Sequence, residues 1–359
     1  MRRHGVICAR QGCRPMALKR VKRMENKNIS KHEMRLSIVS GEWVMYAPGR
    51  GIRPHAVRDP SASTVPVPDR EPSCPFCPGN EQMLPAIRME MRGADGWQIR
   101  AFPNRYPALT LNGTGAETPV DIYRAMQGGG DHEVIVETPL HNRPISRMSA
   151  DEVDLLIEAY HRRYSEMASR PEIKTVTLFR NHGPMAGSSL AHPHSQLIGV
   201  GIIPQSVQRR EQLAAAHFHD RGRCLFCDMV DFEIRDGRRI IFQNQAFIGM
   251  VPFAAEVSCE AWIVPKVHTP DFRAISDSEK SDLADALRVI LAVMREKLND
   301  PDYNFVIHSS LSPTVAPDAL HWHLQIKPIL TTPAGFEMGS GIHINPSLPE
   351  ADASLLAGG

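Results

Sequence analysis

The chain has 359 residues, 42% of them hydrophobic, and its 41 basic side chains nearly balance its 40 acidic ones. A chain of this length and composition can bury a core large enough to fold without disulfide bonds. It contains no run of about 18 apolar residues, which argues against a membrane-spanning segment. A soluble protein without a membrane partner is therefore expected.

Residues 1–33 form a strongly basic leader. They hold ten Lys or Arg against Glu25 and Glu33, which leaves 31 basic and 38 acidic residues in the rest of the chain. The leader lacks the apolar middle of a secretory signal, so the cytoplasm is the expected location. We interpret residues 1–33 as an extension that is disordered or not native, because the first strand pattern begins only near Arg35.

The first structural unit is predicted over residues 34–205, and its motifs begin with Cys74 and Cys77. Paired cysteines at this spacing in a reducing compartment indicate metal or redox chemistry. A Phe-x-Asn motif at residues 102–104 follows. An apolar run typical of a strand, EVIVETPLH, then ends at His141.

A helix is predicted after this strand. Ser149 with Glu152 three residues later is the capping-box signature of a helix start. The strand-like run KTVTLFRN comes after the helix and leads toward His192-Pro193-His194. The helix itself shows apolar residues at helical spacing, namely Val153, Leu156, Ile157, Tyr160, Tyr164 and Met167.

Residues 206–359 repeat these motifs in the same order. The interval from the strand-ending histidine to the later His-x-His is 51 residues in the first unit and 53 in the second. The repeat predicts an α+β fold of two similar units, with mostly antiparallel strands and one long helix per half, and disfavours a doubly wound parallel sheet. The counterparts are Cys224 and Cys227, Phe242 to Asn244, EAWIVPKVH ending at His268, Ser276 with Glu279, YNFVIHSS, and His321 with His323.

The repeat also predicts two metal sites. A structural zinc ion takes four tetrahedral nitrogen or sulfur ligands, and Cys-x-x-Cys supplies two of them. Histidines at matching positions supply the others. The predicted ligand sets are Cys74, Cys77, His141 and His192 in the first unit, and Cys224, Cys227, His268 and His321 in the second.

Assigning the metal to the first histidine of each pair leaves His194 free to face a substrate. The segments before it, Asn181-His182-Gly183 and Gly187-Ser188-Ser189, can place backbone N–H and hydroxyl donors around phosphate oxygens. Gln196 should share the face of His194, because side chains two apart on a strand do so.

These motifs resemble the galactose-1-phosphate uridylyltransferase family, a branch of the histidine-triad superfamily. The resemblance runs from about Arg35 to about Glu350 and rests on the strings CPFCPGNE, FPNRYPAL, FRNHG, GSSLAHPHSQ and GFEMG. It implies duplicated histidine-triad-like units and two structural Zn²⁺ ions in a cytoplasmic homodimer. The implied reaction moves UMP between UDP-glucose and galactose 1-phosphate by a ping-pong mechanism through a covalent nucleotidyl-His194.

The resemblance also implies roles for individual residues. His194 would be the nucleophile, Gln196 a donor to the transferred phosphoryl group and His192 a zinc ligand. The residues that would bind the nucleotide sugar or the hexose 1-phosphate are Arg50, Arg53, Asn104, Asn181, Gly187, Ser189 and Glu337.

Two departures from the family pattern bear on specificity. The commonest form has Gly after His-Pro-His, where this chain has Ser195, and Gln near the position of His343. The second Cys-x-x-Cys resembles a branch that contains ADP-glucose phosphorylases. An ADP-sugar phosphorylase or adenylyltransferase that uses the same histidine is therefore the alternative function.

Hypotheses from other classes remain open on the sequence. If water accepts the nucleotide in place of a sugar phosphate, the chain is a nucleotide hydrolase. If the chain has lost its activity but kept its zinc ions, it is a catalytically dead scaffold. A non-enzymatic zinc-ribbon protein that binds nucleic acid is disfavoured, because the chain after residue 33 is net acidic and lacks interleaved basic and aromatic runs. No nucleic-acid partner is expected.

Overall fold

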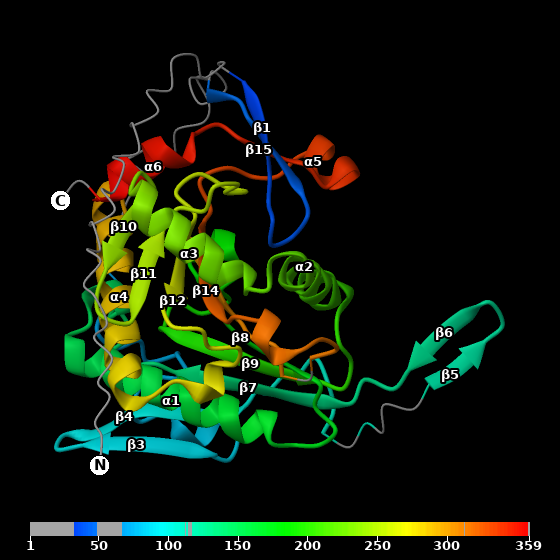
Figure 1. Cartoon of the computed structure of the whole chain (residues 1–359). Helices are drawn as coiled ribbons and strands as arrows, with labels where there is room; N and C mark the ends of the chain where they lie inside the picture. Colours follow the sequence, from blue (N-terminus) through cyan, green and yellow to red (C-terminus); the bar gives the residue numbers. More distant parts are fainter. Residues whose placement is uncertain (1–31, 49–66, 112, 114–116, 312, 358–359) are drawn as a thin grey trace, which may run out of the picture. The chain divides into compact units, whose positions relative to one another are not determined.

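A ten-stranded antiparallel sheet is the centre of the fold (Figure 1). The computed structural model describes residues 32–48, 67–111, 113, 117–311 and 313–357. The prediction of an α+β fold with mostly antiparallel strands is confirmed. In spatial order the strands are β10 (Ile240–Gln243), β11 (Phe247–Met250), β12 (Ala261–Pro265), β14 (His323–Pro328), β13 (Tyr303–His308), β8 (Thr175–His182), β9 (His194–Val200), β7 (Gly130–Val136), β4 (Gly96–Pro103) and β3 (Met89–Gly93).

The strands of the two halves follow a matching order on either side of the central pair, β13 and β8. β8 and β13 pair there, with Tyr303 opposite His182 and Ile307 opposite Leu178. Outward from this pair lie β9, β7, β4 and β3 on one side, and β14, β12, β11 and β10 on the other. β9 begins at His194 and β14 begins at His323, so the two His-x-His motifs enter the sheet at equivalent strands.

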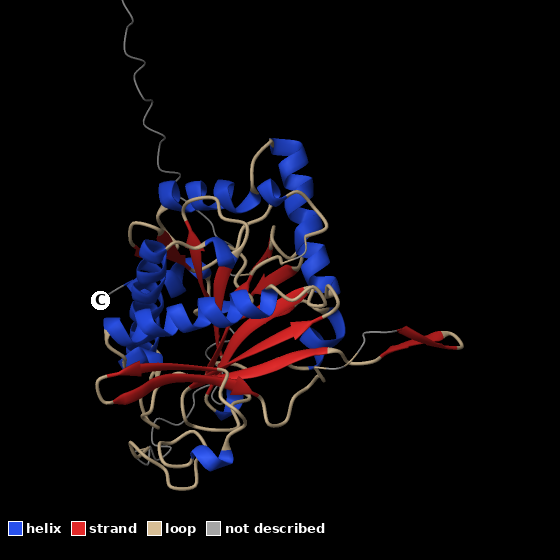
Figure 2. Cartoon of the chain, turned by 90° about the horizontal axis from the view of Figure 1, so that it is seen from below, coloured by secondary structure: helices blue, strands red, loops and turns tan. Residues whose placement is uncertain are grey.

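Two long helices cover one face of this sheet (Figure 2). α1 (Ala150–Ala168) and α4 (Asp277–Lys297) pack against each other. Both predicted capping boxes are present: Ser149 accepts from the Glu152 N–H, and Ser276 accepts from the Glu279 N–H. Each cap satisfies backbone donors that a helix start leaves unpaired, which is typically worth about 1 kcal/mol.

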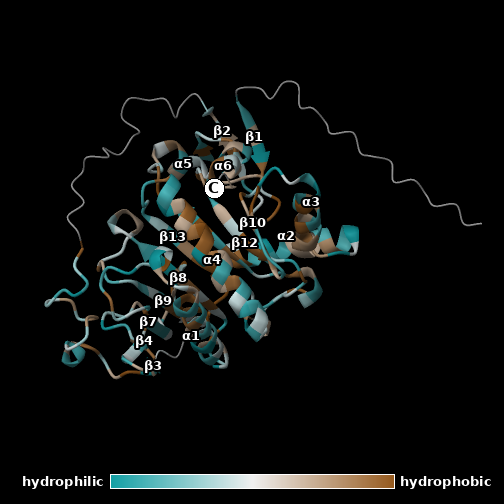
Figure 3. Cartoon of the chain, turned by 90° about the vertical axis from the view of Figure 1, so that its left-hand side faces the viewer, coloured by the Kyte–Doolittle hydropathy of each residue, from teal (hydrophilic) through white to brown (hydrophobic). Residues whose placement is uncertain are grey.

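The main hydrophobic core lies between these helices and the sheet. All six apolar residues predicted for the first helix are buried there. Leu178 and Leu197 face them from the first half of the sheet, and Leu324 and Ile326 from the second. Figure 3 shows hydrophobic stretches on α4 and on the strands near it. Full burial of one such side chain contributes roughly 1.5–3 kcal/mol to the stability of the fold. Because residues of both halves belong to this one core, the core holds the two halves together.

The prediction of one long helix per half is wrong for the second half. Two more helices, α2 (Gln205–Arg221) and α3 (Leu225–Asp236), precede β10. α2 buries only Glu211 and Ala214, so its sequence lacks the apolar stripe by which a packed helix is recognised. Cys224 caps the start of α3, and Cys227 lies in the first turn of that helix.

A small second sheet joins the two ends of the described chain. β1 (Glu33–Leu36) pairs with β2 (Trp43–Tyr46), and β15 (His343–Asn345) adds to β2 in parallel. Arg35 and Arg239 both donate to Glu350 of α6 (Pro349–Ala357). Burial opposes ionisation of this carboxyl, but the two guanidinium groups outweigh it and lower the pKa of Glu350 to about 2.

Two short elements complete the described chain. The hairpin of β5 (Glu117–Val120) and β6 (Tyr123–Met126) is exposed throughout and stands apart from the main sheet in Figures 1 and 2. α5 (Gly335–Ser340) precedes β15. Among the described residues, the helices are too short or too polar to cross a membrane.

Candidate functional site

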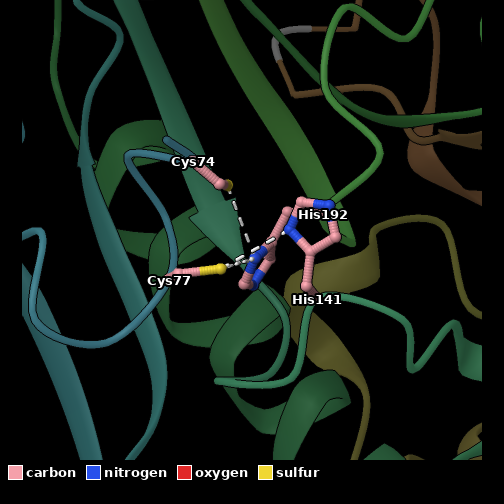
Figure 4. A group of neighbouring side chains, drawn as sticks. All are labelled: Cys74, Cys77, His141 and His192. Atoms are coloured by element: carbon pink, nitrogen blue, oxygen red, sulfur yellow. Dashed lines mark hydrogen bonds between the residues drawn. The ribbon is translucent and has the colours of Figure 1, made fainter. Parts of the chain in front are cut away.

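Four predicted metal ligands of the first half converge beneath the start of β9 (Figure 4). Cys74 and Cys77 lie on a turn, His141 follows β7, and His192 precedes β9. The Cys77 Sγ lies 3.5 Å from the His141 Nδ1 and 3.6 Å from the His192 Nδ1. The Cys74 Sγ lies 3.7 Å from the same His192 nitrogen.

These separations fit a tetrahedral metal ion. Metal–sulfur and metal–nitrogen bonds of about 2.3 and 2.0 Å at a tetrahedral angle place ligand atoms about 3.6 Å apart. The His192 Nε2 lies 2.8 Å from the Thr138 carbonyl and donates to it, which leaves the Nδ1 lone pair for a metal. The residues present therefore fit a dication held by two thiolates and two imidazoles.

The second predicted set forms an equivalent group. The four ligand atoms of Cys224, Cys227, His268 and His321 lie within 4.8 Å of one another. The Cys227 Sγ is 3.6 Å from the His268 Nδ1 and 3.8 Å from the His321 Nδ1. The His321 Nε2 donates to the Pro265 carbonyl at 3.1 Å, as the His192 Nε2 does to the Thr138 carbonyl. This hydrogen bond likewise leaves the Nδ1 lone pair for a metal. Both groups that the sequence predicted are thus brought together.

The thiols of these groups need a cation to ionise fully. In the first group, burial raises the pKa of Cys74 to about 11. In the second, the hydrogen bond between the thiols lowers the pKa of Cys224 and raises that of Cys227, so the pair keeps one proton. A bound dication would displace these protons, because its charge stabilises the thiolates.

His194 begins β9 with one ring nitrogen fixed and the other available. Its Nδ1 lies 2.8 Å from the His192 carbonyl and donates to it, which leaves the Nε2 lone pair as a nucleophile. The side chain is 6% exposed, and burial lowers its pKa, so the ring is neutral at physiological pH. Phe76, between the two cysteines, packs edge-on against His194 with ring centres 5.4 Å apart.

Gln196 shares the face of His194, as predicted, and is held by His132. The Ala108 N–H donates to the His132 Nδ1 at 3.2 Å, so the proton lies on Nε2. That Nε2 donates to the Gln196 Oε1 at 2.8 Å, and the Gln196 NH₂ group remains available as a donor. Asn104 lies beside the same imidazole, with its Nδ2 3.2 Å from the His132 Nε2.

The loop before His194 contains the other predicted nucleotide-site residues. Asn181 lies one residue before the end of β8, where its Oδ1 accepts from the Asn304 Nδ2 at 2.8 Å. Gly187 has a φ of 85° and lies beside Asn181. Ser189 is exposed in the following turn. The loop therefore offers open backbone and an exposed hydroxyl a few residues before His194, groups that can bind phosphate oxygens.

A buried polar network supports the opposite face of β9. Ser195 donates to Glu137 at 2.5 Å, and Tyr160 of α1 donates to the same carboxylate at 2.9 Å. Arg180 pairs with Glu137 at 3.0 Å and also donates to Tyr303 of β13. The network fixes the strand that carries His194 to a helix and to the other half of the sheet.

The remaining predicted residues lie elsewhere. Arg50 and Arg53 fall outside the described residues. Glu337 lies on α5, where it accepts from the Ala334 N–H at 3.0 Å. His343 lies on β15, with its Nε2 3.5 Å from Glu256. None of the hydrogen bonds found among the described residues joins Glu337 or His343 to His194.

Sequence reasoning missed His132 and the Glu137 network. No sequence motif marks His132 as a functional residue. Its partner Gln196 lies 64 positions further along the chain, and Arg180 lies 43 positions from Glu137. The pairings of β7 with β9 and of β8 with β9 bring these residues together, so no local motif could have revealed them.

The comparisons with known proteins identify relatives along most of the chain. The sequence profile described as galactose-1-phosphate uridyl transferase, N-terminal domain, matches residues 22–204. An ADP-glucose phosphorylase of Arabidopsis thaliana is 33% identical over 333 residues, which cover 90% of this chain and 92% of that protein. A galactose-1-phosphate uridylyltransferase of Thermotoga maritima is 25% identical over 338 residues, 90% of this chain and 97% of that protein.

A solved structure is similar over the same length. The crystal structure of the Arabidopsis ADP-glucose phosphorylase with bound ADP-glucose matches with a TM-score of 0.79 and 31% identity, covering 91% of this chain and 98% of that one. The family profile spans half of the chain, and these relatives span nearly all of it. This chain therefore belongs to the galactose-1-phosphate uridylyltransferase family and is an enzyme of the nucleotidyltransferase type.

Proposed function

We propose that this chain transfers a nucleoside monophosphate from a nucleotide sugar to a phosphorylated acceptor, with His194 as the covalent carrier. The observation that carries the proposal is the fixed tautomer of His194: its Nδ1 donates to the His192 carbonyl, and no hydrogen bond to its Nε2 is found among the described residues. A neutral imidazole with one free nitrogen needs no separate base and becomes a good leaving group once phosphorylated.

The reaction has two half-reactions. The His194 Nε2 attacks the nucleotide α-phosphorus, the bond to the bridging oxygen breaks, and hexose 1-phosphate leaves with that oxygen. A phosphate oxygen of the acceptor then attacks the same phosphorus, and the N–P bond breaks. The Gln196 NH₂ group, Ser189 and loop N–H groups would stabilise the charge on the phosphoryl oxygens. Arg50 and Arg53 remain predicted phosphate contacts.

We propose Zn²⁺ for both Cys/His groups, in a structural role. Four protein ligands fill a tetrahedral shell and leave no position for substrate. Through His192 the first ion would fix the backbone carbonyl that sets the His194 tautomer. The repeated motifs and the matching strand order support two duplicated histidine-triad-like units, 34–205 and 206–359.

Two nucleotide sugars are candidate donors. In the uridylyl form, UMP moves from UDP-glucose to galactose 1-phosphate, as the names of the uridylyltransferase relatives suggest. In the adenylyl form, AMP moves from ADP-glucose to phosphate. The Arabidopsis phosphorylase at 33% identity, and its structure with bound ADP-glucose, support the second form.

The hexose 1-phosphate, the homodimer and the cytoplasmic location remain predictions. The alternative of a non-enzymatic zinc-ribbon protein does not hold, because the chain is an enzyme of the nucleotidyltransferase type.

The test is to capture the covalent intermediate. The protein is incubated with UDP-glucose or ADP-glucose labelled at the α-phosphate, and acid-labile, base-stable label on the protein is counted. We expect label from one donor, none after His194→Gly, and normal labelling after His161→Asn on the surface of α1. Label that persists in His194→Gly would sink the proposal. Product analysis with and without galactose 1-phosphate or inorganic phosphate then identifies the acceptor and separates transfer from hydrolysis.

A further inference from the structure

A second polar pocket lies in the C-terminal half, apart from His194. Its cavity volume is about 40 Å³, and the cavity is partly open to solvent. The residues that hydrogen-bond to His194 or Gln196 do not line it. The polar groups around it are Arg210 and Glu211 of α2, His308, Ser309 and Ser310 at the end of β13, the predicted metal ligand His321, and His323 at the start of β14.

Arg210 brings a positive charge to this pocket. Its side chain is half-buried and makes no ion pair and no hydrogen bond among the described residues, whereas the fully buried Arg163, Arg180 and Arg239 each have a carboxylate within 3.0 Å. Burial desolvates the Arg210 guanidinium and lowers its pKa, although Glu211 and Glu256 act in the opposite direction. A partly desolvated guanidinium without a protein partner favours binding of an anion.

His323 adds an unpartnered buried nitrogen. The side chain is 3% exposed, and its Nδ1 is buried without a hydrogen bond. The ring is fixed between Phe226, Trp262 and His308, each with a ring-centre separation of 4.8 Å. Buried polar atoms in native proteins are nearly always satisfied, so this nitrogen indicates a ligand or ordered water in the pocket.

Two acceptors also face the pocket. The Gln325 Nε2 donates to Glu260 at 2.7 Å, so its Oε1 accepts from the His308 Nε2 at 2.8 Å. That hydrogen bond leaves the His308 Nδ1 with a lone pair. The Glu211 Oε2 accepts from the N–H and the hydroxyl of Thr314, and Glu211 has a second oxygen to offer.

We propose that this pocket binds a small phosphorylated molecule that carries both an anionic oxygen and an O–H group. Arg210 and His323 take the anionic oxygens, and Glu211 or the His308 Nδ1 accepts from the O–H. Hydrogen phosphate and sugar phosphates meet this requirement at neutral pH. Sulfate does not, because it is fully ionised and has no O–H.

The test is isothermal titration of the full chain with inorganic phosphate, glucose 1-phosphate and sulfate. We expect the Arg210→Gln variant to lose at least about tenfold in affinity for phosphate or for glucose 1-phosphate. If the variant loses affinity for inorganic phosphate, the ligand is free phosphate. If it loses affinity for glucose 1-phosphate, the ligand is a phosphomonoester. Sulfate should bind the wild type at least about tenfold more weakly than that ligand, and Glu211→Gln should reduce this preference.

Matched controls make each outcome decisive. Arg209→Gln changes the neighbouring, exposed arginine of α2 and should leave every titration unchanged. Arg210→Lys retains the charge without the planar fork and replaces Arg210→Gln if that variant does not fold. Unchanged affinity for both phosphorylated probes in the Arg210 variant, or sulfate binding as tightly as phosphate, would overturn the proposal. Neither result touches the proposed function, because Arg210 is not part of the His194 site.

Discussion

At the scale of single residues, the tautomers of two histidines in this site, His194 and His132, are fixed by backbone groups of opposite polarity. The His192 carbonyl accepts from the Nδ1 of His194 and leaves Nε2 as a nucleophile. The Ala108 N–H donates to the Nδ1 of His132 and makes Nε2 a donor to Gln196. One backbone contact thus decides whether each histidine attacks or donates.

The orientation of Gln196 is predicted to depend on His132. In the variant His132→Ala the Gln196 amide loses the donor that fixes its oxygen, so its NH₂ group would no longer point reliably at the phosphoryl group. Loss of one positioned donor typically costs about 10²–10³ in kcat, and loss of its orientation less, so we expect a fall of roughly tenfold to a hundredfold. Binding of the nucleotide sugar should change little. Steady-state kinetics with the donor that labels His194, with His161→Ala as control, check this; an unchanged kcat would show that Gln196 needs no such support.

At the scale of elements, local signals were predictable and long-range ones were not. The capping boxes at Ser149 and Ser276 mark helix starts within four residues of sequence, and both are present. The two metal groups followed from the repeat of motifs. α2 and α3 did not, because a mostly polar helix such as α2 leaves little hydrophobic periodicity. The Glu137 network was invisible because it depends on the pairing of distant strands.

Two glycines of the loop before His194 allow a sharp comparison of stability. Gly183 (φ 83°) and Gly187 (φ 85°) share a backbone angle that disfavours side chains. A Cβ at Gly183 would lie 2.3 Å from the Asp302 carboxylate, which also accepts from the Met185 N–H at 2.6 Å. A Cβ at Gly187 would meet nothing closer than 3.7 Å.

We therefore expect Gly183→Ala to cost about 3 kcal/mol of unfolding free energy and Gly187→Ala about 1 kcal/mol. The first variant combines a backbone conformation almost confined to glycine (φ 83°, ψ 160°) with a clash, whereas the second has a left-handed conformation (φ 85°, ψ 17°) and no clash. Urea denaturation at fixed metal concentration measures both values. Equal losses would mean that the Asp302 contact does not constrain the loop.

At the scale of the whole molecule, each Cys/His group joins segments that are distant in the chain. The first links the turn at Cys74 to the end of β7 and the start of β9. The second links the start of α3 to the end of β12 and the start of β14. Only the first group adjoins the proposed nucleophile, through His192 and through Phe76, whose ring packs on His194. The two ions should therefore contribute equally to folding but unequally to activity.

Substitution of one cysteine in each group separates these contributions. We expect the wild type to bind two zinc ions per chain and Cys77→Ser and Cys227→Ser to bind one each, with both variants melting several degrees lower because metal binding is coupled to folding. Cys77→Ser should also lose at least about tenfold in kcat, since the His192 carbonyl that sets the His194 tautomer is no longer fixed, whereas folded Cys227→Ser should retain most of its turnover. Metal analysis, thermal melts and kinetics at a temperature where both variants are folded provide the measurements. Loss of the first ion with wild-type turnover would disconnect that ion from the chemistry and leave His194 positioned by the Glu137 network alone.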